Sequence, residues 1–218
     1  IGPSRVDPRT GEIIDGDITM QSGFLNIYRE RFEKYVSDLA MQTKPQILPD
    51  VQQRMQLQVP DGFDPRMCQF GGSELAARAA QAATIASIVR PEEFDVDAFL
   101  SGMLTEVVAH EVGHTLGLRH NFKSSTWLDL DQLEQAGDTA QQGLVGSVMD
   151  YTAINLAGPG KKQGEYFASA VGPCDRWAIE YGYTETGSNE KAVLESIAAR
   201  SAQPGLDYGT DEDSFLGD

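Results

Sequence analysis

The residues best placed to do chemistry are three histidines within eleven positions of one another. The segment HEVGHTLGLRH covers residues 110–120 and contains all three histidines of the chain. His110 and His114 are four positions apart, so on a helix their imidazole rings lie on one face, one turn apart. Gly117 can end such a helix and turn the backbone, which brings His120 back toward the same point. Three neutral imidazole nitrogens arranged in this way can hold one tetrahedral Zn²⁺ ion and leave its fourth position open.

A carboxylate beside this cluster adds the second requirement of metal-assisted hydrolysis. Glu111 follows the first histidine directly, so its side chain can reach a water molecule on the metal without binding the metal itself. Zinc lowers the pKa of such a water from about 15.7 toward about 7, and a neighbouring carboxylate can then accept its proton. A structural zinc site would instead fill the fourth position with a protein ligand. The pattern therefore predicts a catalytic zinc site with Glu111 as the general base.

Chance is a poor explanation of this pattern. A lone histidine on an apolar helical face is usually a hydrogen-bonded core residue, and a bare H-E-x-x-H arises by accident. The longer pattern H-E-x-x-H-x-x-G-x-x-H has a chance occurrence on the order of 10⁻⁵ or less in such a chain. Three buried histidines so close together would also be costly without a shared cation.

A long helix must position the first two histidines. We expect it to start near Asp95 or Asp97 and to run to about Leu116. Its apolar stripe includes Met103 and Val107, and the histidines continue that stripe. The same face therefore points inward.

The rest of the chain reads as short elements separated by loops. A turn signature at residues 7–11 precedes apolar and polar alternation, so we expect a strand over 12–20. Residues 42–72 are rich in Pro, Gln and Gly and are expected to be mostly loop, with a short strand near 55–59. The acidic residues near the C-terminus are expected to be a solvated end. The other expected helices lie at 22–40, 73–89, 129–135, 173–182 and 189–202.

Composition excludes several classes of protein. The chain has 218 residues and a formal net charge of −16, which disfavours a nucleic-acid binder because phosphates require a basic surface. No apolar run reaches the length that spans a membrane. Two cysteines are too few for a disulfide-built scaffold. Cys68 and Cys174 could form one bridge or remain two buried thiols, and sequence separation does not decide between these alternatives.

The histidine motif resembles the signature of the metzincin zinc endopeptidases, which is followed by a methionine turn. The segment GSVMDYT places Met149 29 positions after His120. The resemblance implies that Met149 is an apolar floor beneath the zinc site and not a ligand, although an ordinary core methionine would look alike. It also implies that Tyr151 approaches the zinc and stabilises the tetrahedral intermediate. A tyrosine that only packs is the alternative.

Further segments extend the resemblance from about residue 2 to residue 183. GPSRVDPRTGEIIDGDITM, VVAHEVGHTLGLRHNFKSS, SVMDYTA and DRWAIEYGY are similar to a group of large bacterial zinc metalloproteases labelled met-zincin domains of unknown function. Members of that group are typically exported and carry additional domains on the N-terminal side. The resemblance therefore implies an exported protein, periplasmic, cell-surface or secreted, whose longer parent chain carries other domains.

The implied fold is α+β and helix-rich, a metzincin-like catalytic domain with a small sheet above the active-site helix and a helical C-terminal subdomain. Metzincin domains normally have several strands before that helix, whereas one or two can be identified here. Either the upstream strands lie outside this sequence or the group builds its upper part differently. We expect residues 1–120 to hold the edge strand and the zinc-binding helix, and residues 121–218 to hold the methionine turn and further helices.

The edge strand of a metzincin sheet binds substrate as an additional antiparallel strand. Segment 12–20 is our candidate for that edge, with Ile14, Gly16 and Ile18 on it. We predict zinc-dependent hydrolysis of bonds in a peptide or protein substrate, with Glu111 as the general base. Two alternatives stay open. One is a zinc-binding module without catalysis that displays a surface for a partner or a glycan, and the other is hydrolysis of a non-peptide amide.

Overall fold

The computed structural model describes residues 4–18, 79, 81–86, 94–134, 139–158 and 160–214. The chain forms two compact units. One comprises Ile1 with Thr19–Val96, and the other comprises Gly2–Ile18 with Asp97–Asp218. Most of the described residues belong to the second unit, which joins the N-terminal segment to the C-terminal half of the chain. The domain boundary expected at residue 120 stays a prediction.

Little of the first unit falls within the described residues. Residue 79 and residues 81–86 are helical, in agreement with the helix expected over the alanine-rich stretch 73–89. The helix expected over 22–40 lies outside the described residues. So do the loop and short strand expected within 42–72.

Helix α4 spans Val96–Thr115 and carries two of the three histidines. Asp97 lies in its first turn, where a negative charge complements the helix dipole. The side chains on its buried face recur every three or four residues: Phe99, Met103, Glu106 and His110. Phe99 packs edge-to-face on Tyr166 and Phe167, with ring centroids 5.0 and 4.8 Å apart. The predicted helix and its inward face are thus confirmed.

Helix α4 ends in a Schellman motif at Gly117. The Leu118 amide donates to the Gly113 carbonyl at 2.9 Å, and the Gly117 amide donates to the His114 carbonyl at 3.0 Å. Gly117 has a φ of +86°, a left-handed conformation that a side chain would strain. The predicted helix end is confirmed, and the reversal directs the chain toward His120.

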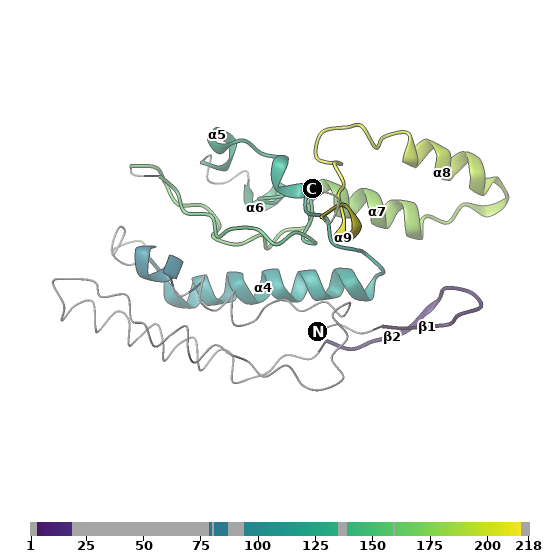
Figure 1. Cartoon of the computed structure of the whole chain (residues 1–218), viewed down its shortest axis with the longest axis horizontal. Helices are drawn as coiled ribbons and strands as arrows, with labels where there is room; N and C mark the ends of the chain where they lie inside the picture. The colour runs from purple at the N-terminus through teal and green to yellow at the C-terminus, as the bar shows by residue number, and fades with distance from the viewer. Residues whose placement is uncertain are drawn as a thin grey trace. The chain divides into compact units, whose positions relative to one another are not determined.

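An N-terminal hairpin forms the two-stranded sheet of the described residues. Strand β1 (Ser4–Val6) pairs antiparallel with strand β2 (Ile13–Gly16), through a turn in which Gly11 has a φ of +77°. A Cβ atom added to Gly16 would lie 2.9 Å from the Cβ atom of Thr115. The hairpin therefore packs against the C-terminal end of α4, as Figure 1 shows.

Strand β2 is shorter than the strand expected over 12–20. It ends at Gly16, and residues 17–18 follow without strand structure. The Asp15-Gly16-Asp17 sequence explains the early end, because glycine and aspartate are depleted in strands. Residues 19–20 lie outside the described part of the chain.

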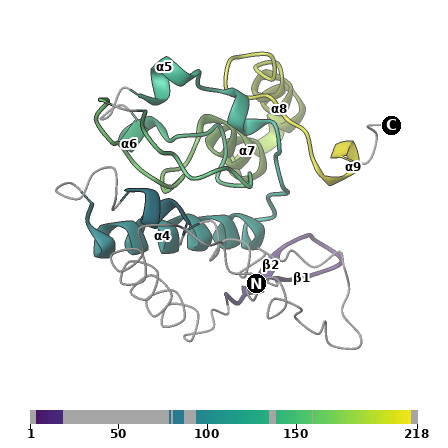
Figure 2. The same ribbon diagram turned by 60° about the vertical axis from the view of Figure 1, so that its left-hand side comes forward.

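Short helices and loops follow α4 and lie along one side of it in both views (Figures 1 and 2). Leu144, Val145 and Ala168 form a buried apolar cluster among them, with Leu133 packed against it. The elements are η1 (Ser124–Thr126), α5 (Leu130–Leu133), α6 (Thr139–Gln142), α7 (Pro173–Tyr183), η2 (Gly187–Asn189), α8 (Glu190–Ala198) and α9 (Asp211–Ser214).

Local sequence signals explain where these helices begin and end. Asp129 caps α5 in a capping box, and Pro173 occupies the first position of α7. Helix α8 ends at Ala198, before the end of the expected range 189–202. Pro204 follows closely, and the chain turns before it. None of the described helices combines the length and apolar content that crossing a membrane requires.

Candidate metal centre

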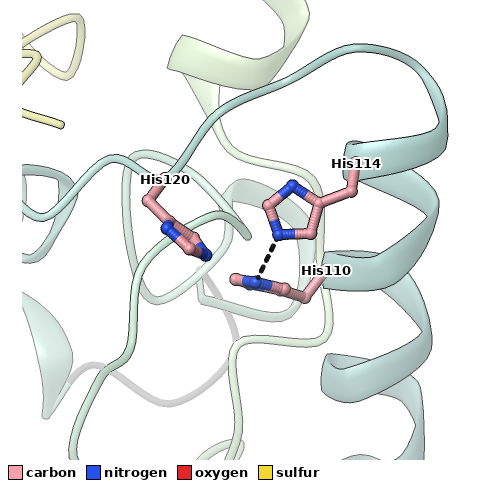
Figure 3. A group of neighbouring side chains, drawn as sticks. All are labelled: His110, His114 and His120. Atoms are coloured by element: carbon pink, nitrogen blue, oxygen red, sulfur yellow. Dashed lines mark hydrogen bonds between the residues drawn. The ribbon is translucent and has the colours of Figure 1, made fainter. Parts of the chain in front are cut away.

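Three histidine side chains gather at the C-terminal end of α4 (Figure 3). His110 and His114 project from successive turns of the helix, and His120 faces them from the returning chain. One ligand nitrogen from each ring lies within 4.8 Å of the other two. The Nε2 atoms of His110 and His114 are 3.1 Å apart. The structure thus brings together the three residues that the motif singled out.

Each ring is oriented by an oxygen atom at its other nitrogen. The Nδ1 atom of His110 lies 2.9 Å from the Val148 carbonyl oxygen, and that of His114 lies 3.0 Å from the Leu118 carbonyl oxygen. A carbonyl oxygen only accepts, so both Nδ1 atoms donate a proton, and in the neutral ring this leaves a lone pair on Nε2. The Nδ1 atom of His120 lies 2.8 Å from a carboxylate oxygen of Asp211.

This donor set suits a zinc ion. Tetrahedral zinc with Zn–N bonds of about 2.0–2.1 Å requires nitrogens about 3.3 Å apart, close to the His110–His114 separation of 3.1 Å. Two lone pairs at this separation repel each other unless a proton or a cation lies between them. Oriented imidazoles with a hydrogen-bonded second nitrogen are the usual zinc ligands. His110, His114 and His120 could therefore hold the ion and leave one position for another ligand.

Met149 packs on α4 beside the histidines. Its side chain is buried, and a Cβ atom added to Gly113 would lie only 2.2 Å from its sulfur. Gly113 precedes His114, so the absence of a side chain there lets the methionine reach the helix. The Met149 carbonyl also accepts a hydrogen bond from the Asn121 amide at 3.0 Å, which ties this turn to the chain that follows His120.

Asp175 holds the same turn from the first turn of α7. It is buried, and its carboxylate accepts hydrogen bonds from the Ser147 hydroxyl at 2.5 Å and from the amides of Val148 and Gly172 at 2.9 Å. Burial raises the pKa of Asp175, although these hydrogen bonds oppose the shift. Because the Val148 carbonyl also contacts the His110 ring, Asp175 is linked to a candidate metal ligand through one residue.

Asp150 fixes the other side of the turn. One of its carboxylate oxygens accepts from the Ser124 hydroxyl and from the Ser125 amide, both at 2.9 Å. The second oxygen accepts from the Tyr151 amide at 2.8 Å. These bonds give Asp150 a structural role in the turn from which the Tyr151 side chain leaves.

The Tyr151 ring lies at the metal centre. Its hydroxyl is 2.9 Å from the Nε2 atom of His120, and its ring stacks on that of His110 with centroids 5.0 Å apart. Tyr151 is also partly exposed to solvent. The phenol therefore reaches the point on which the imidazoles converge, as the resemblance implied, while its catalytic role stays a prediction.

Glu111 lies next to His110 on α4 and is only 1% exposed, with both carboxylate oxygens shielded from solvent. The structure places it one residue after His110, a candidate metal ligand on the same helix. Its role as general base stays a prediction.

Of the three residues expected to bind substrate, two lie on a strand of the hairpin and one does not. Ile14 and Gly16 lie on β2, and Ile14 points outward with 65% of its surface exposed. Ile18 lies beyond the end of the strand and is half-buried. Gly16 contacts Thr115, so β2 approaches α4 one residue after His114.

Two carboxylates of this centre were not found from the sequence. Asp175 carries a local signal, since an acidic residue in the first turn after a helix-starting Pro173 is a capping pattern. Asp211 carries none, because it belongs to an acidic run that looked like a solvated end. Burial acts to raise the pKa of Asp211, but its contact with His120 and the charge of Arg119 hold that pKa below its ordinary value.

Cys174 is a buried free thiol beside this network. It is not disulfide-bonded, and the Asn121 amide group lies 3.4 Å from its sulfur. Burial, with a smaller effect of the Asp175 charge, raises the pKa of Cys174 to about 11. A raised pKa keeps Cys174 in the weakly nucleophilic thiol form at neutral pH. Cys68 lies outside the described residues.

Comparison with known proteins supports the same assignment. A family model described as Met-zincin matches residues 92–218, which include α4, the three histidines and the turn at Met149. No curated protein and no solved structure matches the chain. The match covers more than half of the chain, and the structure independently assembles a three-histidine cluster that could bind a metal. The chain therefore belongs to the Met-zincin family.

Proposed function

We propose that this chain is a zinc-dependent endopeptidase. The observation that carries the proposal is that one nitrogen from each of three imidazole rings converges on one point. An oxygen atom at the other nitrogen orients each ring. A bound zinc ion would acidify a water molecule and polarise the scissile carbonyl group. The remaining tasks, which are proton transfer, stabilisation of developing charge and placement of the peptide, fall to side chains of this chain.

Glu111 is the proposed general base. Its carboxylate would accept a proton from the attacking water and pass that proton to the leaving amine. Its position beside His110 on the buried part of α4 supports this role, because a shielded carboxylate interacts strongly with a proton in a site that excludes bulk water.

Tyr151 is proposed to stabilise the oxyanion. Its hydroxyl now lies 2.9 Å from the Nε2 atom of His120. With a metal held by His120, the Tyr151 hydroxyl would donate toward a substrate oxygen instead. Met149 is proposed as the apolar floor, because its packing on Gly113 keeps polar groups away from that side of the centre.

The proposed substrate is an extended peptide or protein segment. Strand β2 pairs with β1 along one edge, and the peptide would add to the sheet through backbone hydrogen bonds near Ile14, Gly16 and Ile18. Contact between Gly16 and Thr115 supports this placement because it puts β2 close to the end of the metal-binding helix.

Digestion of unfolded casein tests the proposal. We expect zinc-loaded protein to cleave casein and a chelator to abolish the cleavage. Glu111→Gln should keep zinc binding and lower the rate by roughly 10²–10⁴-fold. Glu106→Gln is the matched control, since it changes another buried glutamate of α4 and should leave the rate near that of the parent.

Other outcomes would favour the alternatives. Tight zinc binding without cleavage of casein or of small amides would favour a non-catalytic module that presents a surface to a partner or a glycan. Cleavage of small amides alone would favour a non-peptide substrate. Equal rates for Glu111→Gln and the parent would remove Glu111 from the mechanism.

We also propose that the protein is exported and works beside other domains of a longer parent chain. The support is the resemblance of the four sequence segments to exported metalloproteases. Fractionation of source cells followed by immunodetection tests this, and a purely cytoplasmic signal would contradict it.

A further inference from the structure

One acidic side chain reaches the metal centre from the far end of the chain. Asp211 begins α9 (Asp211–Ser214), and its Oδ1 atom lies 2.8 Å from the Nδ1 atom of His120, 91 residues earlier. Asp211 keeps 42% of its side-chain surface exposed, whereas the His120 side chain is largely buried. The carboxylate thus approaches the ligand from the solvent side.

One backbone hydrogen bond and two bonds of the Asn121 side chain hold the segment in front of α9 against the chain that follows His120. The Phe122 amide donates to the Gly209 carbonyl at 2.7 Å, and the Gly209 amide donates to the Asn121 side-chain oxygen at 3.1 Å. The Asn121 side-chain nitrogen donates in turn to the Asp207 carbonyl at 3.0 Å. These reciprocal bonds place Asp211 in a defined position.

Ion pairs contribute less to this placement. Arg119 contacts Glu212 at 2.6 Å and Asp211 at 3.7 Å, but all three side chains are substantially exposed. Exposed ion pairs typically stabilise by roughly 0–1 kcal/mol. The docked backbone, rather than Arg119, therefore determines where Asp211 lies.

His120 differs from the other two ligands in what orients it. His110 and His114 donate to backbone carbonyls, whereas His120 faces a carboxylate. A carboxylate at the second ring nitrogen fixes the tautomer and ring orientation of a ligand and increases its basicity. Asp211 is thus a side chain through which one ligand can be altered without touching the ligand itself.

We propose that Asp211 is a positioning residue of the metal centre, which fixes the tautomer and orientation of His120 and thereby tightens zinc binding. The inference rests on one part of the proposed function, zinc binding, and requires no peptidase activity. It assigns the acidic C-terminal segment to the metal centre.

Zinc affinity, measured by competition with a chromophoric chelator, tests the proposal on the whole chain. Asp211→Ala should weaken zinc binding by roughly 10–100-fold. Glu212→Ala is the matched control, because it removes the same charge from the next position and contacts Arg119 instead of a histidine. It should change zinc affinity by less than about threefold, in line with the small value of an exposed ion pair.

The imidazole ¹⁵N signals of the metal-free protein provide a second readout. In the parent and in Glu212→Ala, His120 should carry its proton on Nδ1. In Asp211→Ala, the proton of His120 should be shared between both ring nitrogens, as a mixture of tautomers. Asp211→Asn keeps an acceptor oxygen, so its zinc affinity should lie between those of Asp211→Ala and the parent. A merely structural role would not move the tautomer of a single ring.

The outcomes separate this inference from the proposed function. A parent protein that binds no zinc would overturn the proposed function, while the ring signals would still show whether Asp211 orients His120. Parent-like zinc affinity and an unchanged tautomer in Asp211→Ala would overturn the inference alone. Equal losses of affinity in Asp211→Ala and Glu212→Ala would also overturn it, because they would indicate a general effect of negative charge.

Discussion

Glu106 lies one helical turn before His110 and is 8% exposed, with its carboxylate accepting a hydrogen bond from the Ala168 amide at 2.9 Å. Burial raises the pKa of Glu106 to about 7, and the amide hydrogen bond only partly opposes this. The folded protein therefore binds a proton more tightly than the unfolded chain does. Stability contributed by the neutral group is present at acidic pH and is lost as the pH rises from about 4.5 to about 7.

Glu106→Gln should remove this pH dependence. Replacing the carboxyl group by an amide keeps an acceptor for Ala168 but removes the buried charge. The difference in free energy of unfolding between the variant and the parent should grow by about 3 kcal/mol, in favour of the variant, from pH 4.5 to pH 8. This value follows from the size of the pKa shift. Urea denaturation at each pH, with excess chelator, measures the free energy of unfolding of both proteins. The histidines contribute equally to both, so their effect cancels in the difference. Glu195→Gln on α8 is exposed and should behave as the parent does; parallel pH profiles for all three proteins would contradict the assignment.

Gly113 gives a sharper steric test of the metal centre. Gly113→Ala places a methyl group where the Met149 sulfur now lies, 2.2 Å from the ideal Cβ position. We expect a loss of about 1–3 kcal/mol in the free energy of unfolding, as for other overpacked cores, together with weaker zinc binding. The control is Gly182→Ala on α7, where the added Cβ meets nothing within 4 Å and should stabilise slightly. Equal stability of Gly113→Ala and the parent would show that Met149 can move aside.

At the scale of elements, α7 supports the metal centre from outside it. Its first turn presents Asp175 to the turn that contains Ser147 and Val148, and the Val148 carbonyl then orients His110. The far end of the same helix contacts the residue that follows α4, since the Tyr183 hydroxyl donates to the Leu116 carbonyl at 3.0 Å. One helix thus contacts both the turn that contains Met149 and the C-terminal cap of α4.

Asp175→Ala should loosen the turn and weaken the metal site together. The substitution leaves the Ser147 hydroxyl and the amides of Val148 and Gly172 without their carboxylate, which costs about 2–4 kcal/mol for buried donors. Denaturation and zinc competition on the same samples measure both effects. Arg176→Ala, an exposed neighbour on α7, should change neither. A large loss of stability with parent-like zinc affinity would show that the turn does not position His110.

At the scale of the whole molecule, zinc should stabilise the fold. A ligand that binds only the folded state at a hundred times its Kd adds about 2.7 kcal/mol, which for a chain of this size raises Tm by about 5–10 °C. The net charge of −16 could attract any divalent cation, so Mg²⁺, which prefers oxygen ligands, is the necessary comparison. Scanning calorimetry should show a rise in Tm when zinc is added to the parent. It should show no such rise with Mg²⁺, and none when zinc is added to His114→Ala. An equal shift with Mg²⁺ would indicate general charge screening.

Those parts of the centre that depend on local periodicity could be predicted from the sequence. On a helix, the four-residue spacing of His110 and His114 is enough to predict that their rings lie on one face. Gly117 predicts the helix end because glycine readily adopts a positive φ. Strand β2 was expected to be longer, because alternation of apolar residues says little about where pairing stops. Asp211 could not be foreseen, since its partner lies 91 residues away and such contacts leave no period in the chain.

That long separation has a consequence for biosynthesis. A ribosome adds about 5–20 residues per second, so His120 leaves it roughly 5–18 s before Asp211 does. During this interval the nascent polypeptide already presents three imidazoles, but the third lacks the carboxylate that steers it. Translation therefore supplies the carboxylate of this histidine cluster only after all three of its imidazoles.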